Sequence, residues 1–318
     1  MNYDPMSSGV SAFTSAALLT ASLTLIILVV SGSTGLLRTQ GELRTFRLIG
    51  STFARIAKHG WRLLGLSLLG GALYSISAIT AFFAGRLTSL LDLFIWAGLV
   101  FIGHRILLAD TARQKGMDIG ERGIGAVFLR GIVLGLIVFA ILLLALTLGA
   151  GTSYILASVA PGSSYTEWLL GAATGIAAMV GSVYLARLSF VYPSTALGER
   201  RWFVTALQRS RSEGTALAAA LWLIGALSLL FVLVLLAVAS LTAAGTGMLN
   251  LVAANDPSAS AMSSGITLFL GTQFVLMSLL SAYSLVSIAC VSAAYDQVVL
   301  SKIETEGQRT EKTDMHTT

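Results

Sequence analysis

Long apolar runs, each bounded by arginine or lysine, are the feature that most constrains how this chain folds. Between Arg187 and Leu227, one apolar run ends in arginine, a basic and partly apolar segment follows, and a second apolar run begins. About 20 apolar residues in a helix are long enough to cross the ~30 Å hydrocarbon core of a bilayer. The recurrence of this pattern predicts an all-α, polytopic transmembrane helix bundle.

The composition agrees with a membrane protein. Only 11% of the 318 residues are charged, whereas a soluble domain is about 25% charged, and the mean hydropathy is +0.83. The pI of about 9.6 is high, but the basic residues stand at the ends of the apolar runs, where they orient a membrane protein. We therefore expect no nucleic acid partner. The single cysteine, Cys290, lies in an apolar run, which excludes an intrachain disulfide.

The apolar runs predict about seven spans, at residues 11–37, 62–84, 88–109, 125–149, 169–192, 215–242 and 266–299. A cleaved signal peptide is the alternative for the first run and would leave six spans. Such a peptide needs a basic n-region, which is absent here, and residues 31–33 make a poor cleavage site. In the second span, Gly65, Gly70 and Gly71 would let a neighbouring helix approach closely.

The basic residues predict the orientation of the spans. Of the 20 lysines and arginines, six lie in residues 38–62, five in 105–130, five in 187–211 and three in the tail, which leaves only Arg86 on the other side. This bias places these segments in the cytoplasm of a bacterial inner-membrane protein, with the N-terminus outside and the C-terminus inside. The expected organisation is an N-terminal transmembrane helix (1–37), a six-helix membrane domain (38–300) and a disordered cytoplasmic tail (301–318).

The first basic loop has the pattern of an amphipathic helix that lies on the cytoplasmic membrane surface. At 100° per residue the two sides separate into an apolar set (Phe46, Ile49, Phe53, Ile56 and Ala57) and a polar set (Arg44, Arg47, Ser51, Arg55 and Lys58). Trp61 then marks the interface at the start of the second span.

A second interfacial helix is predicted over residues 200–213. Trp202, Phe203, Ala206 and Leu207 share a side opposite Arg201, Gln208 and Arg211, while Arg209 falls on the aromatic side and would have to snorkel. In such helices the aromatic side rests at the acyl boundary, and each cation near an anionic headgroup contributes about 1 kcal/mol. A solvated loop that only sets topology is the alternative. The candidate lipid or partner contacts are Arg47, Arg55, Lys58, Arg200, Arg201, Trp202, Phe203, Arg209 and Arg211.

Ionisable residues in or near the spans form a second group of candidates. They are Asp92, His104, Arg105, Asp110 and Arg187, with Arg130 and Asp296 near predicted helix ends. A charge inside a bilayer is costly and suggests a pathway or relay. Most of these residues lie within a turn or two of a helix end, where snorkelling satisfies them. Asp92 lies deeper in the third span, and a structural pair with a nearby arginine is the alternative role for Asp110.

The segment from Arg187 to Gly214 carries a family resemblance. An arginine at a helix end is followed by Pro193, by the Gly198-Glu199 turn and by Ala-Leu-Gln-Arg-Ser at residues 206–210. This order resembles a bacterial family of membrane domains, known from the membrane anchors of glycerophosphoryl diester phosphodiesterases and from stand-alone inner-membrane proteins. The resemblance implies about six helices with amphipathic cytoplasmic connections. The chain departs from the family in the early position of Gly214 and in its extra N-terminal span.

The motifs of catalysis are missing from the sequence. The phosphodiesterase barrel would need about 250 residues of soluble patterning, and neither a Walker A sequence, nor a metal-spaced Cys or His pair, nor a nucleophile elbow occurs. We therefore expect no enzyme and no cofactor. The favoured hypothesis is an accessory, scaffold or assembly subunit whose basic loops bind anionic lipid or a membrane partner, including a second copy of the chain. A small transporter or permease subunit is the alternative, and a membrane lipid enzyme ranks last.

Overall fold

A computed structural model describes residues 5–34, 43–84, 88–117, 119–120, 123–137, 165–199, 203–231, 233 and 259–302. Within these residues every regular element is helical, as the sequence predicts. The labelled elements are α1 (Pro5–Thr34), α2 (Thr45–Ala84), α3 (Thr88–Gln114), α5 (Tyr165–Leu188), α6 (Val191–Ala196), α7 (Phe203–Arg209), α9 (Ala259–Tyr295) and the π-helical turn η2 (Asp296–Leu300). Two further helical segments are Ile124–Ile137 and Gly214–Phe231.

Five of the described helices are long and apolar enough to cross a membrane. Their apolar windows are Thr14–Ser31, Leu91–Gln114, Leu170–Ala196, Gly214–Phe231 and Gln273–Leu300, which correspond to the first, third, fifth, sixth and seventh predicted spans. The predicted second span lies in α2 but is not among the five, and residues 138–149 of the fourth fall outside the described residues. An all-helical fold is therefore confirmed, and its five long apolar helices are compatible with a multi-pass transmembrane bundle, while the total of seven spans stays a prediction. The tail from residue 303 onward also lies outside the described part.

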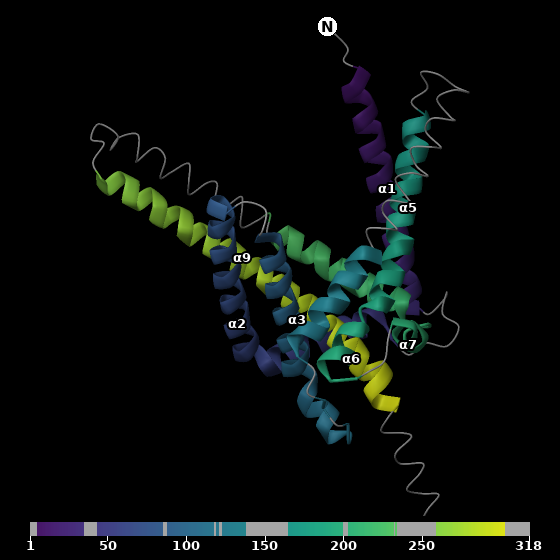
Figure 1. The fold of residues 1–318 in the computed structure, drawn as a ribbon. Coiled ribbons are helices and arrows are strands. Elements are labelled where there is room, and N and C mark those ends of the chain that lie inside the picture. The colour runs from purple at the N-terminus through teal and green to yellow at the C-terminus, as the bar shows by residue number, and fades with distance from the viewer. Residues whose placement is uncertain are drawn as a thin grey trace, which may run out of the picture.

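The helices form two groups that meet at one end (Figure 1). In Figure 1, α1 and α5 run side by side in one group, and α2, α3 and α9 pack against one another in the other. Near the common end lie α6, α7 and the C-terminal part of α9. Ion pairs and hydrogen bonds join the first part of α2 to the ends of α3, α5 and α9 there, so the described residues of the three basic segments lie together. We call this region the basic end.

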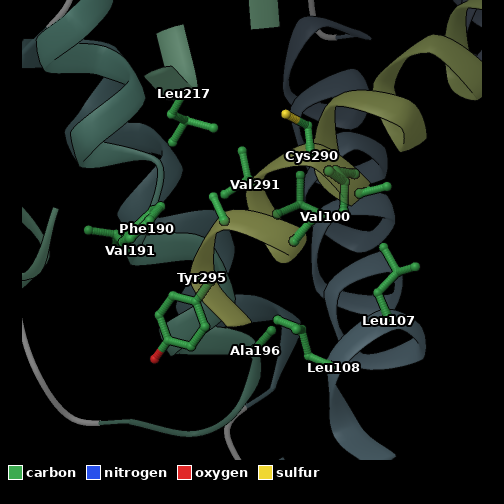
Figure 2. Close-up of a cluster of buried hydrophobic side chains, with 14 of the residues drawn as sticks. Val100, Leu107, Leu108, Phe190, Val191, Ala196, Leu217, Cys290, Val291 and Tyr295 are labelled. Carbon is green, nitrogen blue, oxygen red and sulfur yellow. The ribbon is translucent and has the colours of Figure 1, made fainter. Parts of the chain in front are cut away.

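The main core is concentrated at the basic end. Figure 2 shows Leu108 of α3, Phe190, Val191 and Ala196 next to α9, whose Tyr295 is buried among them. The rings of Phe190 and Tyr295 meet edge to face, with their centroids 5.7 Å apart. The fully buried side chains of this cluster give the short elements between spans a hydrophobic anchor, which fixes them against the helix ends.

The sides of the spans present apolar residues outward instead. Leu18 of α1 is 63% exposed and Leu230 is 60% exposed, and Leu91, Ile176 and Val275 are exposed as well. So much outward apolar surface would favour aggregation in water, whereas lipid tails are as apolar as these side chains. The distribution is that of helices which face lipid along their length and pack tightly at one end.

Two glycines of α2 allow neighbouring helices to approach closely. A Cβ atom at Gly71 would lie 2.7 Å from Ser278 Cα, so α2 and α9 can meet at this distance only without a side chain there. A Cβ at Gly70 would similarly meet Leu99 Cδ2 at 3.0 Å. The predicted close approach is confirmed at these two glycines, but Gly65 has open space beside it. Among these three glycines, close packing against neighbouring helices is therefore limited to Gly70 and Gly71.

Candidate membrane-surface site

The α2 helix combines the first predicted amphipathic segment with the predicted second span. It is helical from Thr45 to Ala84 except at His59, whose φ of −111° and ψ of 17° lie in the bridge region between helix and strand. The irregular residue comes two positions before Trp61, the predicted interface marker, which is 86% exposed. The structure therefore confirms a helix over residues 45–58 of the first basic loop, and the irregular His59 separates it from the predicted second span. We call residues 45–58 the α2 surface segment.

The α2 surface segment has three faces, where the helical wheel predicted two. One face is directed into the protein: Leu48 and Thr52 are fully buried, and Ile49 and Ile56 pack against the core. Thr52 Oγ1 donates to Leu48 O at 2.8 Å, which satisfies a hydroxyl in this apolar setting. The α2 surface segment therefore packs against the core from Leu48 to Ile56.

The other two faces of the segment are exposed and lie next to each other. Phe46 is 62% exposed and Phe53 is 50% exposed, so a stripe of aromatic surface is left outside the core. Arg47 and Lys58 are exposed on the neighbouring face. An exposed aromatic stripe bordered by cations is the arrangement of a helix that lies in a membrane interface.

Arg55 differs from its neighbours because it points into the protein. Its guanidinium pairs with Asp296 of η2, and its Nη1 donates to Leu107 O at 3.1 Å. Lys115, just after α3, reaches the same carboxylate with Nζ 3.4 Å from Oδ1. Two cations from different segments thus share one anion and tie α2, α3 and η2 together. Arg55 was predicted as a lipid or partner contact, and the structure instead gives it an internal role.

The second predicted interfacial helix is described only in part. α7 covers Phe203 to Arg209, while Arg200, Arg201 and Trp202 lie outside the described residues. Phe203 packs against the core. Arg209 forms an ion pair within the protein instead of snorkelling, with its Nη1 2.9 Å from Glu199 Oε2.

The same Glu199 carboxylate also binds α9. The hydroxyl of Tyr295 donates to Glu199 Oε1 at 2.8 Å, and Arg209 Nη1 lies 3.5 Å from that hydroxyl. Glu199 follows Gly198, which has a φ of +88° and whose Cβ, if present, would lie 2.9 Å from the carbonyl carbon of Gly120. Glycine is needed here both for the left-handed backbone and for the close approach of the two loops.

Three arginines in helices bind oxygen atoms of the short elements between spans. Arg105 donates from Nε to Ala196 O at 2.9 Å and from Nη2 to Gly120 O at 2.7 Å. Arg187 donates from Nη2 to Leu207 O at 2.6 Å, and Arg130 bonds to the hydroxyl of Thr195. Sequence reasoning assigned these arginines to snorkelling and missed these bonds, because most of the acceptors are backbone oxygens of α6, α7 and Gly120, which no sequence motif marks.

The remaining predicted polar residues do not form one site. His104 is buried, with Nδ1 2.7 Å from Ser292 Oγ, whereas Asp110 is exposed at the end of the same helix. No ion pair joins Asp110 to an arginine within the described residues. Asp92 is exposed on α3. His104, Arg105 and Asp110 therefore have separate surroundings.

A shallow basic cavity lies where α2 changes direction. Its volume is about 550 Å³, and it is lined by Lys58, His59, Trp61, Arg62 and Asp110, among others. Burial lowers the pKa of His59, and the positive charges of Lys58, Arg62 and Arg55 lower it further, against a smaller opposing effect of Asp110. His59 is therefore neutral at pH 7, and the positive charge of the cavity comes from Lys58 and Arg62.

None of the family models, curated proteins or solved structures compared with this chain matches it. The resemblance to the membrane anchors of glycerophosphoryl diester phosphodiesterases therefore stays a prediction. In the part of the chain that the structure describes, no three His, Cys, Asp or Glu side chains gather as a metal site.

Proposed function

We propose that this protein is a non-enzymatic accessory or scaffold subunit of the bacterial inner membrane, which binds anionic lipid at the cytoplasmic surface through its α2 surface segment. The observation that carries the proposal is the exposure of Phe46 and Phe53 beside the exposed Arg47 and Lys58. The same helix is anchored in the core by Leu48 and Thr52. Its outward faces are therefore presented on a fixed support.

The physics of a charged membrane surface gives each face a separate role. The two phenylalanines would enter the boundary between headgroups and acyl chains, where an aromatic ring loses contact with water. Arg47, Lys58 and Arg62 would lie near the headgroups and contribute about 1 kcal/mol each in an anionic leaflet. The cationic share of this binding weakens with salt, because exposed charges are screened beyond about 10 Å at 0.1 M ionic strength.

A scaffold role is supported by how the other basic residues are used. Arg55, Arg105, Arg187 and Arg209 bind groups of the protein itself. These bonds hold the segments between spans in one arrangement and leave a smaller set of cations for the membrane. The outward apolar faces of the spans offer a further surface for lipid or for other membrane helices.

The test is gentle extraction of the full chain from its native membrane, followed by mass spectrometry of the lipids and proteins that co-purify. The variant Arg47→Gln/Lys58→Gln/Arg62→Gln is compared with Lys302→Gln/Arg309→Gln/Lys312→Gln, which loses the same charge from the tail. We expect at least a fivefold loss of co-purifying anionic lipid for the α2 variant only. Equal lipid in all three samples would contradict the proposal. A stoichiometric protein partner lost only from the α2 variant would replace lipid with a protein at this surface.

A further inference from the structure

A second cavity lies beside the packed pair α1 and α5, and no residue of the α2 surface segment lines it. Its volume is about 310 Å³, and its lining residues come from α1, α5 and the start of the helical segment Gly214–Phe231. Leu28, Met179, Val180 and Val183 form an apolar wall, and Arg187, Arg211 and Ser212 form a polar end. The cavity thus extends along α5 toward the basic end, and it has an apolar part and a cationic part.

Arg187 is held at the polar end of this cavity by the chain around it. Its Nη2 donates to Leu207 O at 2.6 Å, whereas its Nε is shielded from solvent and has no hydrogen-bond partner among the described residues. The stem of the side chain lies against Gly214, where a Cβ atom would be 2.7 Å from Arg187 Cγ. A buried N–H without an acceptor is unfavourable. Arg187 therefore brings a cation, with one donor left without a partner in the described part of the chain, to the lining of the cavity.

Arg211 provides a second cation, and the carboxylate of the nearby buried Glu213 accepts hydrogen bonds from the protein itself. Arg211 is exposed and lines the cavity. Glu213 accepts a hydrogen bond from Leu43 N at 2.9 Å and another from Ser212 Oγ at 3.1 Å. The helix that starts at Gly214 has first-turn N–H groups without intrahelical partners, and their partial positive charge adds to that of the arginines.

We propose that this cavity binds one anionic phospholipid, with its phosphate between Arg187 and Arg211 and an acyl chain along Leu28, Met179 and Val180. The apolar wall favours a lipid over free phosphate, since a soluble anion would leave that wall without contact. The volume falls at the lower end of the range of ligand pockets, about 300–1,000 Å³, which suits part of one lipid molecule. The inference rests on the proposed function for the anionic membrane but uses residues outside the α2 surface segment.

The test is a lipid titration of the full chain in detergent, followed by native mass spectrometry. Phosphatidylglycerol is the anionic probe and phosphatidylcholine the neutral comparison. We expect one phosphatidylglycerol to bind to the unmodified protein in preference to phosphatidylcholine. Arg211→Gln should weaken this binding about fivefold, the factor that corresponds to the ~1 kcal/mol of one interfacial cation.

A second variant tests the apolar wall without a change of charge. Val180→Phe fills the cavity and should also reduce binding at least fivefold, while Ile176→Phe, exposed one turn away on α5 and outside the lining, should not. The Arg47→Gln/Lys58→Gln/Arg62→Gln protein should keep this single lipid even where it loses the rest. Failure of one proposal is therefore distinguishable from failure of the other.

Three results would overturn the proposal. The first is equal phosphatidylglycerol binding by Arg211→Gln, Val180→Phe and the unmodified protein. The second is displacement of the lipid by glycerol phosphate or inorganic phosphate at equal concentration, which would identify a soluble anion as the ligand. The third is a dimer that dissociates in Val180→Phe, which would identify a second copy of the chain as the occupant.

Discussion

Replacing Asp296 by asparagine removes the anion that two cations share at the basic end. Arg55 from α2 and Lys115 from the segment after α3 both approach this carboxylate. Asparagine has nearly the same shape, so the packing of η2 is kept while the charge is lost. Two cations then remain close together without their counter-charge.

The exposure of these side chains sets the size of the effect. Asp296 is 17% exposed and each cation is 19% exposed, so the group lies between a surface pair and a buried one. Exposed pairs contribute about 0.2–1 kcal/mol, and removal of one partner from a buried pair costs about 3–5 kcal/mol. We expect Asp296→Asn to lower the free energy of unfolding by about 2 kcal/mol.

The lone cysteine gives a direct assay for this change. Cys290 is completely buried in α9 and is the single cysteine of the sequence. A thiol-reactive dye in mild detergent therefore reports the opening of the core around α9. A loss of about 2 kcal/mol should raise the labelling rate about 30-fold when opening and closing are faster than the reaction with dye.

Asp110→Asn is the matched control. It removes the same charge from an exposed aspartate near the end of α3, and its labelling rate should stay within about twofold of the unmodified protein. The double variant Arg55→Gln/Asp296→Asn should be less destabilised than the sum of its single changes, because the two side chains interact directly. The reasoning is refuted if Asp296→Asn and Asp110→Asn label at the same rate.

Three further predictions concern α2 and the loops. Gly71→Ala should lower the free energy of unfolding by about 1–3 kcal/mol, because the added Cβ would overlap α9. Gly65→Ala on the same helix should not lower it. The melting temperatures of the two variants in detergent test this difference. Gly198→Ala should destabilise more than Gly116→Ala, since both glycines have positive φ but only the first contacts another loop; equal melting shifts would show that contact to be unimportant. Because the pKa of His59 is lowered in the folded protein, the unfolded chain binds a proton more readily than the folded chain does. The contribution of His59 to the free energy of unfolding is therefore complete above pH 6.5 and decreases as the pH falls below that value. His59→Gln should therefore lose less stability than the unmodified protein between pH 7.5 and 5.5, and an identical loss would count against the pKa shift.

The sequence was sufficient for features that depend on local periodicity. The positions of five helices long and apolar enough to cross a membrane follow from apolar runs, and the helix over residues 45–58 follows from the spacing of its apolar residues. The close approach at Gly71 was also foreseeable, because a missing side chain is visible in the sequence. Each of these features is decided by a short stretch of chain.

Features that depend on distant partners were not foreseeable from the sequence. The wheel grouped Ile49 with Phe53, yet Ile49 packs against the core and Phe53 is exposed. Hydrophobicity alone does not say whether a side chain meets protein or lipid. Arg55 likewise matched its exposed neighbours, although its partner Asp296 lies 241 residues further along the chain. Only the tertiary fold separates the internal cations from the surface ones.

The most direct test of the central claim is the membrane depth of the α2 surface segment. Nitroxide spin labels are placed at Phe53→Cys and, as a control, at its exposed neighbour Ala54→Cys, in a Cys290→Ala protein reconstituted into phosphatidylglycerol-containing liposomes. The account predicts that the label at position 53 collides with dissolved oxygen and is protected from a water-soluble nickel complex, while the label at position 54 is accessible to nickel. Equal and high nickel accessibility at both positions would contradict a membrane-bound α2 surface segment.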